Sequence, residues 1–340
     1  MKRTLLFLLK LGLLAGLFVA AAGVGGLTYF HYGDPRNTCA SCHEMTAVHS
    51  AWSESAHASV HCRNCHGGSL TLDVHALRAH VNRVVQHFSG HADDPIRLTE
   101  RDVLALHEAC RTCHARTFAD WQSSRHATSY ATIFLDPVHN KAEQLAPDCL
   151  RCHGMFFDGQ IEDLVGPLDT AGPWALKHEA KAAHAAIPCL ACHQVHAPAA
   201  ESGAAQLYVR RESTYFPCKL LPATPMRQGD RAIRISSDPR QRLCVQCHAP
   251  NAFRQVGTED DRTPAGVHEG LSCFDCHQSH SLSAKVSCAA CHPGNSHCGI
   301  DVEKMDTTFN VPGSKHNIHT VACGDCHHGQ RPGLKEAKEK

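Results

Sequence analysis

The longest apolar run in the chain lies at its N-terminus. It covers Leu5–Phe30 and contains a single charged residue, Lys10. The part Leu11–Phe30 alone has the roughly 20 residues that span the hydrocarbon core of a bilayer. This pattern predicts a membrane anchor over residues 1–31. Because two basic residues precede the run, we expect the N-terminus in the cytoplasm and the rest of the chain outside the membrane.

A cleaved signal peptide is the alternative interpretation of the same run. Ala20-Ala21-Ala22 resembles a processing site of the A-x-A type. The apolar residues nevertheless continue through Val24, Leu27 and Phe30, beyond the point where a short signal core ends. The length therefore favours a retained transmembrane helix.

The polar part of the chain shows a few shorter patterns. A helical stretch is predicted over residues 70–87. Thr99 followed by Asp102 resembles a capping box, and the apolar residues after it predict a helix that continues into residue 110. Tyr208-Val209, Tyr215-Phe216 and Ile233–Ile235 suggest short strands or a hairpin.

One motif, Cys-x-x-Cys-His, occurs nine times. It is the attachment site of c-type haem, in which both thiols form thioethers with the porphyrin and the histidine binds the iron. The predicted attachment residues are Cys39, Cys42 and His43; Cys62, Cys65 and His66; Cys110, Cys113 and His114; Cys149, Cys152 and His153; Cys189, Cys192 and His193; Cys244, Cys247 and His248; Cys273, Cys276 and His277; Cys288, Cys291 and His292; and Cys323, Cys326 and His327.

Chance does not account for this motif. With 20 Cys and 29 His in 340 residues, about 0.1 accidental matches are expected from composition. Zinc is the alternative ligand, but zinc sites do not need a histidine directly after every second cysteine. The sequence therefore predicts nine covalently bound haem c groups.

Nine haems leave about 38 residues for each group. Porphyrins must then supply much of the apolar interior, since aromatic residues make up only 6% of the chain. We expect a mainly α fold with much irregular structure, consisting of an N-terminal transmembrane helix and haem-packed cytochrome c domains.

Charge and cysteine counts add two points. Lys+Arg and Asp+Glu are both 33, so nothing indicates a nucleic-acid partner, and the haem propionates would make the assembled protein acidic. Eighteen cysteines belong to the motifs, which leaves Cys218 and Cys298 to form a disulfide or to remain thiols.

The order of motifs near the N-terminus resembles a known family. The apolar anchor is followed by Cys39–His43, by Met45 two residues later, by the phrase Trp52–His57 and then by the second motif. Asp94–Glu100 leads toward the third. Over residues 1–155 the chain resembles the NapC/NirT/NrfH family of membrane-anchored multihaem cytochromes, which are quinol dehydrogenases. The resemblance implies a four-haem domain over residues 32–155, and residues 156–340 then form an additional five-haem part.

In that family the methionine two places after the first haem histidine can bind the first iron. Met45 matches this position, and thioether ligation raises a haem potential, as suits the acceptor of electrons from quinol. The alternative is that Met45 only packs against the porphyrin. The lysine and aspartate that the family places near quinol have no clean match among Asp73, Arg78, Asn82 and Arg83.

Twenty histidines lie outside the motifs, while about eight are needed as second axial ligands if Met45 serves one iron. Most of the favoured candidates stand in helical or Ser-x-His contexts shortly before a motif. They are His57, His61, His87, His107, His126, His184, His268 and His316. Two further histidines, His196 and His280, follow a motif histidine by three residues.

Three functions are compatible with these features. The first is electron transport from the quinol pool of the inner (cytoplasmic) membrane to a periplasmic reductase or another cytochrome. The second is a multihaem reductase of nitrite, hydroxylamine, tetrathionate or sulfite with one open haem, for which a basic loop before Cys244 that contains Cys218 would attract the anion. A soluble periplasmic shuttle is the third possibility if the N-terminus is removed. Whether the chain is an enzyme is left open by the sequence.

Overall fold

The computed structural model describes residues 2–34, 37–67, 74–91, 98–197, 206–212, 214–217, 226–228, 230–248, 263–280, 284, 288, 290–292, 306–308, 311 and 313–326. The chain divides into two compact units. Unit 1 comprises residues 1–98, 108–110 and 195–202, and unit 2 comprises residues 99–107, 111–194 and 203–340. The described residues are about half helical, with much irregular structure between the helices. The predicted boundaries near residues 31 and 155 stay predictions.

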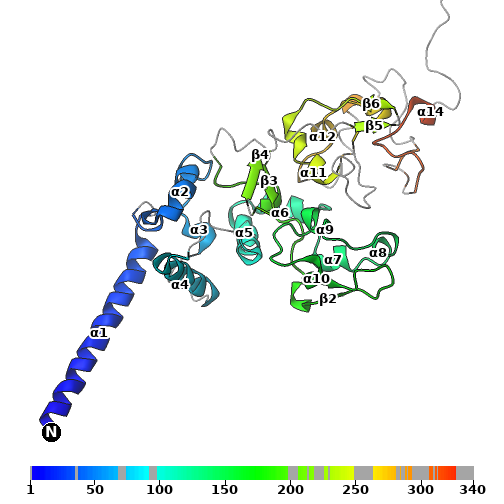
Figure 1. Cartoon of the computed structure of the whole chain (residues 1–340). Coiled ribbons are helices and arrows are strands. Elements are labelled where there is room, and N and C mark those ends of the chain that lie inside the picture. Colours follow the sequence, from blue (N-terminus) through cyan, green and yellow to red (C-terminus); the bar gives the residue numbers. More distant parts are fainter. Residues whose placement is uncertain are drawn as a thin grey trace, which may run out of the picture. The chain divides into compact units, whose positions relative to one another are not determined.

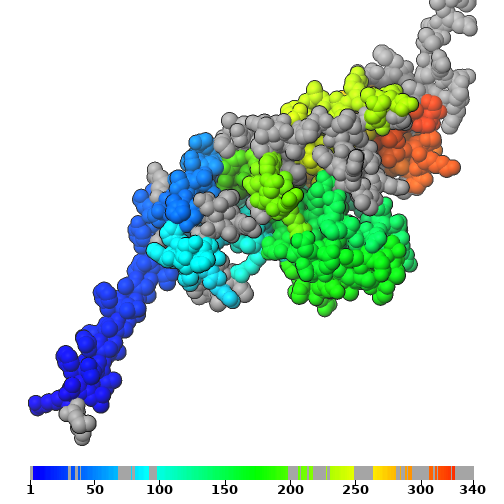
Figure 2. Space-filling view, viewed as in Figure 1, coloured from blue at the N-terminus to red at the C-terminus, as the bar shows by residue number. Residues whose placement is uncertain are grey.

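Unit 1 begins with one long helix, α1 (Lys2–Tyr32), whose side chains are exposed along its length. Figure 2 shows it as a single rod of spheres at the N-terminal end of the chain. Its segment Arg3–Tyr29 has a mean hydropathy of 2.4, and α1 is long and apolar enough to cross a membrane. A signal sequence passes the same test, so the structure adds weak support for the anchor.

Short helices follow α1 in unit 1. They are η1 (Cys39–Ser41), η2 (His43–Met45), α2 (Thr46–Ser53), α3 (Arg63–His66) and α4 (Val74–Ser89). The helix predicted over residues 70–87 is confirmed from residue 74 onward; its first residues lie outside the described part. Figure 1 shows α4 at the same end of this unit as the C-terminal turn of α1.

Unit 2 contains most of α5 (Glu100–Cys113), whose start is the predicted cap. The Asp102 N–H donates to Thr99 Oγ1 at 3.3 Å, and that hydroxyl donates to Asp102 Oδ2 at 2.9 Å. Glu100 and Asp102 also place negative charge in the first turn, where the helix dipole favours it. Val103, Leu106 and His107 are buried at helical spacing. The capped helix into the third motif is therefore confirmed.

A protein core lies in unit 2 between residues 130 and 186. It consists of Tyr130, Phe134, Leu145, Leu150, Phe157, Ile161, Leu164, Val165 and Ala186. These side chains come from α7 (Tyr130–Phe134), α9 (Cys149–Cys152), α10 (Ile161–Leu164), β1 (Val165–Gly166) and the segments between them. Ser129 caps α7 by accepting the Thr132 N–H at 3.2 Å. Apolar side chains thus form a core of their own in this part of the chain.

The other described elements of unit 2 are short. The helices are α6 (Ala115–Gln122), α8 (His139–Ala142), η3 (Glu179–Lys181), η4 (Cys189–Ala191), η6 (Pro239–Arg242), α11 (Val245–His248), η8 (Gly266–His268), α12 (Cys273–Cys276) and α14 (Cys323–Cys326). The remaining strands are β2 (Ala175–Leu176), β3 (Gln206–Val209), β4 (Thr214–Pro217), β5 (Met226–Gln228) and β6 (Arg231–Ile233).

The strands form three antiparallel pairs, β1 with β2, β3 with β4 and β5 with β6. In the β3–β4 hairpin Tyr208 lies opposite Tyr215, so the hairpin suggested by these residues is confirmed. Tyr208 packs on Phe156 with ring centres 4.4 Å apart, and the Tyr215 hydroxyl donates to Leu190 O at 3.1 Å. The strand expected over 233–235 ends at Ile233, because the Arg234 N–H donates to Glu269 Oε1 at 2.8 Å instead of to a neighbouring strand.

Candidate haem sites

Six of the nine Cys-x-x-Cys-His motifs share one local hydrogen bond. In these six the histidine N–H donates to the carbonyl of the first cysteine, with N to O distances of 2.7–3.0 Å; these histidines are His66, His153, His193, His248, His277 and His292. This is the hydrogen bond of a single helical turn. Residues three apart on such a turn face the same side, so both thiols can reach one porphyrin edge. None of the fifteen cysteines whose side chains the structure describes is in a disulfide.

Six motif histidines face a second histidine ring at nearly constant separation. The ring centres are 5.6 Å apart for His43 and His87, 5.9 Å for His66 and His196, 5.8 Å for His193 and His280, 6.0 Å for His248 and His126, 6.1 Å for His277 and His319, and 6.3 Å for His292 and His268. Two imidazoles on opposite sides of one metal, with bonds of about 2 Å each, have ring centres about 6 Å apart. The spacing leaves room for one iron between the rings.

The angles between the ring planes also agree with such a pair. They range from 3° for His277 and His319 to 85° for His292 and His268. If an iron lay between two such rings, each ring could rotate about its own bond to the metal, so any angle between the ring planes would be allowed. The nitrogen donors and paired thiols therefore fit covalently bound haem c.

Three of the histidines favoured from sequence lie opposite a motif histidine: His87, His126 and His268. Three partners were missed, namely His196, His280 and His319. The spacing of three residues after a motif histidine was the available signal for His196 and His280. For His319 the sequence feature is the asparagine two residues earlier, because the His319 N–H donates to Asn317 Oδ1 at 3.0 Å.

That contact belongs to a recurring turn. In three of the chain's Ser-x-His phrases the histidine N–H donates to the serine hydroxyl two residues earlier, at 3.1 Å for His57, 3.2 Å for His126 and 3.1 Å for His316. Asn317 makes the same turn before His319. These three phrases are thus similar in backbone geometry, and asparagine substitutes for serine in it.

The other favoured histidines make different contacts. His61 Nδ1 accepts the Arg63 N–H at 3.3 Å. His107 is buried beside the fifth motif, where its Nδ1 accepts the Cys189 N–H at 3.2 Å. His57 lies close enough to His196 that its charge lowers the pKa of that imidazole, second to the effect of burial.

His184 and His316 contact carboxylates. His184 Nδ1 is 3.0 Å from Glu100 Oε1, and the same buried carboxylate accepts a hydrogen bond from Lys181. His316 Nδ1 is 3.5 Å from Asp325 Oδ1, which places it beside the ninth motif. His327, the iron-binding histidine of that motif, lies outside the described residues, as do Cys218 and Cys298.

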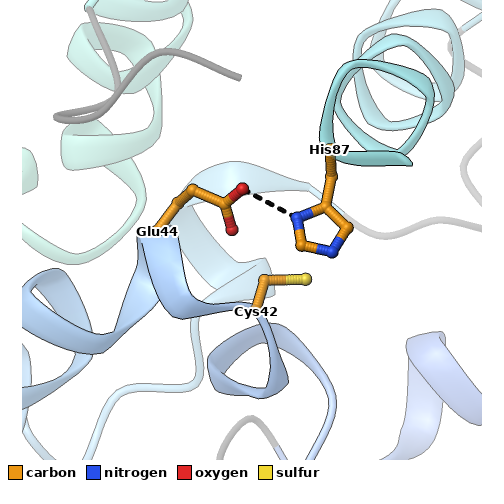
Figure 3. A group of neighbouring side chains, drawn as sticks. All are labelled: Cys42, Glu44 and His87. Carbon is orange, nitrogen blue, oxygen red and sulfur yellow. Dashed lines mark hydrogen bonds and ion pairs between the residues drawn. The ribbon is translucent and has the colours of Figure 1, made fainter. Parts of the chain in front are cut away.

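The first motif holds a buried carboxylate next to both of its candidate ligands. Glu44 Oε1 is 2.7 Å from His87 Nδ1 and 3.4 Å from His43 Nε2, and the Glu44 side chain is 6% exposed. Figure 3 shows Glu44 and His87 joined by this hydrogen bond, with Cys42 beside them. The hydrogen bond from His87 is the main reason that the pKa of Glu44 is lowered.

This contact fixes which His87 nitrogen is available. A carboxylate that accepts from Nδ1 leaves Nε2 for a metal. Cys42 Sγ, a Glu44 oxygen and a His87 nitrogen lie within 4.8 Å of one another and could hold a metal ion, but the position of Cys42 in a haem motif explains its thiol. Met45 lies half-buried in η2, and its ligation of the first iron stays a prediction.

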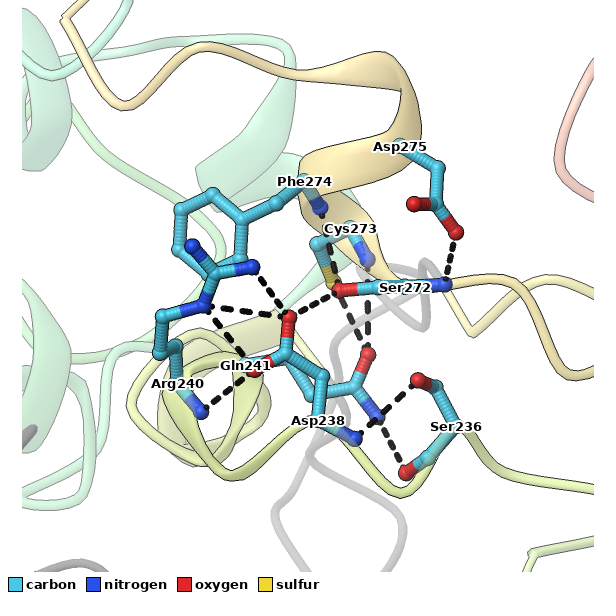
Figure 4. Close-up of polar contacts among 8 residues, drawn as sticks. All are labelled: Ser236, Asp238, Arg240, Gln241, Ser272, Cys273, Phe274 and Asp275. Atoms are coloured by element: carbon cyan, nitrogen blue, oxygen red, sulfur yellow. Dashed lines mark hydrogen bonds and ion pairs between the residues drawn. The ribbon is translucent and has the colours of Figure 1, made fainter.

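A polar network joins the sixth motif to the seventh (Figure 4). Asp238 accepts hydrogen bonds from Arg240 at 2.7 Å and from the Ser272 hydroxyl at 2.8 Å. The buried Gln241 accepts the Cys273 N–H at 3.3 Å and donates to Ser236 O at 2.9 Å. The Arg240 guanidinium is the main cause that holds the pKa of Asp238 far below its usual range.

Cysteine contacts show which motifs of unit 2 are neighbours. The side chains of Cys244 of the sixth motif and Cys273 of the seventh lie next to each other. The side chain of Cys247 of the sixth motif likewise lies next to Cys152 of the fourth. The sixth motif therefore lies between the fourth and the seventh, so the spatial order differs from the order along the chain.

In the described part of the basic loop before Cys244, several arginines make contacts within the protein. Arg231 binds Glu269 at 2.7 Å, Arg240 binds Asp238, and Arg234 donates to Glu269 O at 2.8 Å. Arg210 lies over the Phe157 ring, 5.9 Å from its centre. These contacts give the cations a structural role.

Comparison with known proteins gives one family. Residues 109–194 match the family Cytochrome c554 and c-prime. The match covers the third, fourth and fifth motifs and about a quarter of the chain. It supports a multihaem c-type cytochrome with covalently bound haem c that takes part in electron transfer. No curated protein and no solved structure matches the chain, and the resemblance to the NapC/NirT/NrfH family stays a prediction.

Proposed function

We propose that the protein is a membrane-anchored nine-haem cytochrome that passes electrons from the quinol pool to an acceptor in the periplasm or beyond. The observation that carries this proposal is the set of six histidine pairs about 6 Å apart. Haem iron supplies reversible one-electron chemistry. Paired histidines around each iron favour transport of electrons over binding of a substrate.

The pairs support a proposed second iron ligand for six of the haems. His87 would serve the first haem, His196 the second, His280 the fifth, His126 the sixth, His319 the seventh and His268 the eighth. Two ligands from separate segments on each iron also tie distant parts of the chain together. In the second and fifth haems the ligand comes from a segment that follows a different motif.

The reductase alternative receives less support. Its strongest argument was a cationic approach for an anion in the basic loop. Arg231 and Arg240 are instead neutralised by carboxylates in the described part of that loop. A site with paired charges attracts an anion less than a site with unpaired cations does.

The quinol pool is proposed as donor on the evidence of position and resemblance. The first motif begins seven residues after the end of α1, which supports placing that haem near the membrane surface. The periplasmic side follows from the basic residues before the anchor. A periplasmic reductase or another cytochrome is the proposed acceptor.

The test uses the full holoprotein in lipid nanodiscs. Menaquinol is expected to reduce the haems, a quinol-site inhibitor is expected to block this, and dithionite is expected to reduce them in either case. Reduction by dithionite but not by menaquinol would exclude the quinol donor. A high-spin ferric signal together with turnover of nitrite or hydroxylamine by a reduced dye would favour the reductase.

A further inference from the structure

The helix α4 exposes an apolar stripe. Val81, Val84, Val85 and Phe88 are 50%, 51%, 58% and 84% exposed. Their spacing of three, four and seven residues places them on one face of the helix. Exposed Asn82, Arg83 and Gln86 occupy the rest of the same turns, so the helix is amphipathic with its apolar side uncovered.

The stripe is distinct from the side of α4 that contacts the first motif. That contact is made by His87, which is the one half-buried residue between positions 81 and 90. His87 lies about a third of a turn from the centre of the stripe, given 3.6 residues per turn. Val84 is the stripe residue next to His87 on the helix, whereas Val85 lies on nearly the opposite side from His87. A porphyrin held by His87 would therefore lie to one side of the stripe, next to Val84.

The same unit contains the membrane helix α1. Arg3–Tyr29 is about 40 Å long at 1.5 Å per residue, whereas the hydrocarbon core is about 30 Å thick. The last turn, with exposed Tyr29 and Tyr32, then lies in the interfacial region that such aromatic residues prefer. The hydrogen bond between Glu44 and His87 ties α4 to the segment that directly follows this turn.

The charged residues of α4 also favour contact with the membrane surface. Arg78 and Arg83 are exposed on α4, and the described part of the helix carries no acidic residue. A helix with an apolar face and basic polar residues binds the interface of a bilayer that contains anionic lipids. The membrane that α1 is proposed to span offers such an interface next to α4.

We propose that α4 lies in the membrane interface next to α1, with Val81, Val84, Val85 and Phe88 inserted among the lipid acyl chains. This inference rests on the proposed membrane attachment of α1. It deepens the proposed function, because α4 carries His87 and would hold the first haem at the depth at which quinol is oxidised.

The test is photolabelling from the lipid. The holoprotein is placed in nanodiscs of phosphatidylethanolamine and phosphatidylglycerol that contain a phospholipid with a diazirine in its acyl chain. After irradiation and digestion, mass spectrometry is expected to find adducts in α1 and in residues 81–88. The double variant Val84→Asp/Val85→Asp should reduce the adducts in residues 81–88 about tenfold, whereas Gln86→Asp on the polar side should leave them unchanged.

Each other result contradicts the inference in a recognisable way. Labelled α1 with unlabelled α4 would show that α4 is away from the bilayer although the anchor is correct. Unlabelled α1 would remove the membrane attachment itself. Loss of haem or an altered haem absorption spectrum in Val84→Asp/Val85→Asp would show that a porphyrin covers the stripe, and the wild-type menaquinol assay separately tests the proposed function.

Discussion

Histidine is the residue type that most clearly marks the candidate haem sites of this protein. In the structure six motif histidines lie near a second imidazole, with ring centres 5.6–6.3 Å apart, a separation that fits one iron between them. The backbone turns before His126 and His319 show how such a side chain is set locally. A serine or asparagine two residues earlier binds the histidine N–H and fixes the direction in which the ring leaves the chain.

His280→Ala and His196→Ala are each expected to open the sixth position of one iron. One of the nine haems should become high-spin, because the imidazole opposite the motif histidine is lost. Electron paramagnetic resonance of the oxidised holoprotein measures this as a new ferric signal. His139→Ala is the matched control, since His139 is exposed on α8. An unchanged spectrum in both ligand variants would refute these assignments.

The first haem allows a direct comparison of His87 with Met45. His87→Met is expected to raise the potential of one haem by on the order of 0.1 V, a fraction of the about 0.8 V that axial ligands can span. Met45→Leu is expected to change no potential. A spectroelectrochemical titration measures both variants. A shift in Met45→Leu without one in His87→Met would instead make Met45 the ligand, as the family resemblance implies.

At the scale of elements, most motifs occupy a single helical turn that depends on neighbouring segments for its position. The network from η6 to α12 is the clearest example. Asp238 and Gln241 of one segment bind Ser272 and Cys273 of the other. These contacts hold the sixth and seventh attachment sites next to each other, as neighbouring haems require for rapid electron transfer.

Gln241→Ala is expected to destabilise this junction by about 0.5–1.5 kcal/mol, because the part-buried Cys273 N–H loses its acceptor. Hydrogen exchange of residues 272–276 should become faster, while the same residues should be unaffected by Gln122→Ala at the exposed end of α6. Exchange that stays at the wild-type rate in Gln241→Ala would show that the network does not position α12.

The same junction should respond to acid. The pKa of Asp238 is lowered in the folded protein, so its contribution to stability is present above the unfolded-state pKa of about 3.9 and is lost as the pH falls through the lower folded-state value. Protection factors for residues 238–242 are expected to decline only below about pH 4. Asp238→Asn should remove this pH dependence, and a decline that persists in this variant would assign it to another group.

At the scale of the molecule, apolar side chains supply only part of the buried apolar contacts that a stable fold needs. The buried cluster in unit 2 extends from Tyr130 to Ala186, within the segment that matches a multihaem cytochrome family. Of the motifs, only the fourth contributes a side chain, Leu150, to the cluster found among the described residues. Porphyrins at these motifs would supply the missing apolar contacts, and two axial ligands per iron would link the segments.

Intact mass spectrometry of the purified protein is expected to give the full chain plus nine haem groups. Nine attachment motifs predict this number, and retention of α1 predicts that residues 1–22 are present. A mass with nine haems but without those residues would exclude the membrane anchor. Cys323→Ala/Cys326→Ala should lower the count to eight, which tests whether the ninth motif is used.

Local patterns were enough to predict several parts of the structure. The apolar run predicts α1, Thr99 and Asp102 predict the start of α5, and the aromatic and β-branched residues Tyr208-Val209 and Tyr215-Phe216 predict the β3–β4 hairpin. Each depends on hydrogen bonds or side chains within a few residues. The end of β6 was predicted two residues too late, since Glu269 binds Arg234 from a distant segment.

The sequence by itself determined the candidate haem attachment sites, because both thiols and one iron ligand of such a site lie within five consecutive residues. It did not determine candidates for the second iron ligand. His66 and His196, or His126 and His248, lie more than a hundred residues apart, and twenty spare histidines offered many equivalent choices. Only the tertiary structure decided which of the described histidines lie near a motif histidine, because the position of a ring depends on how separate segments pack.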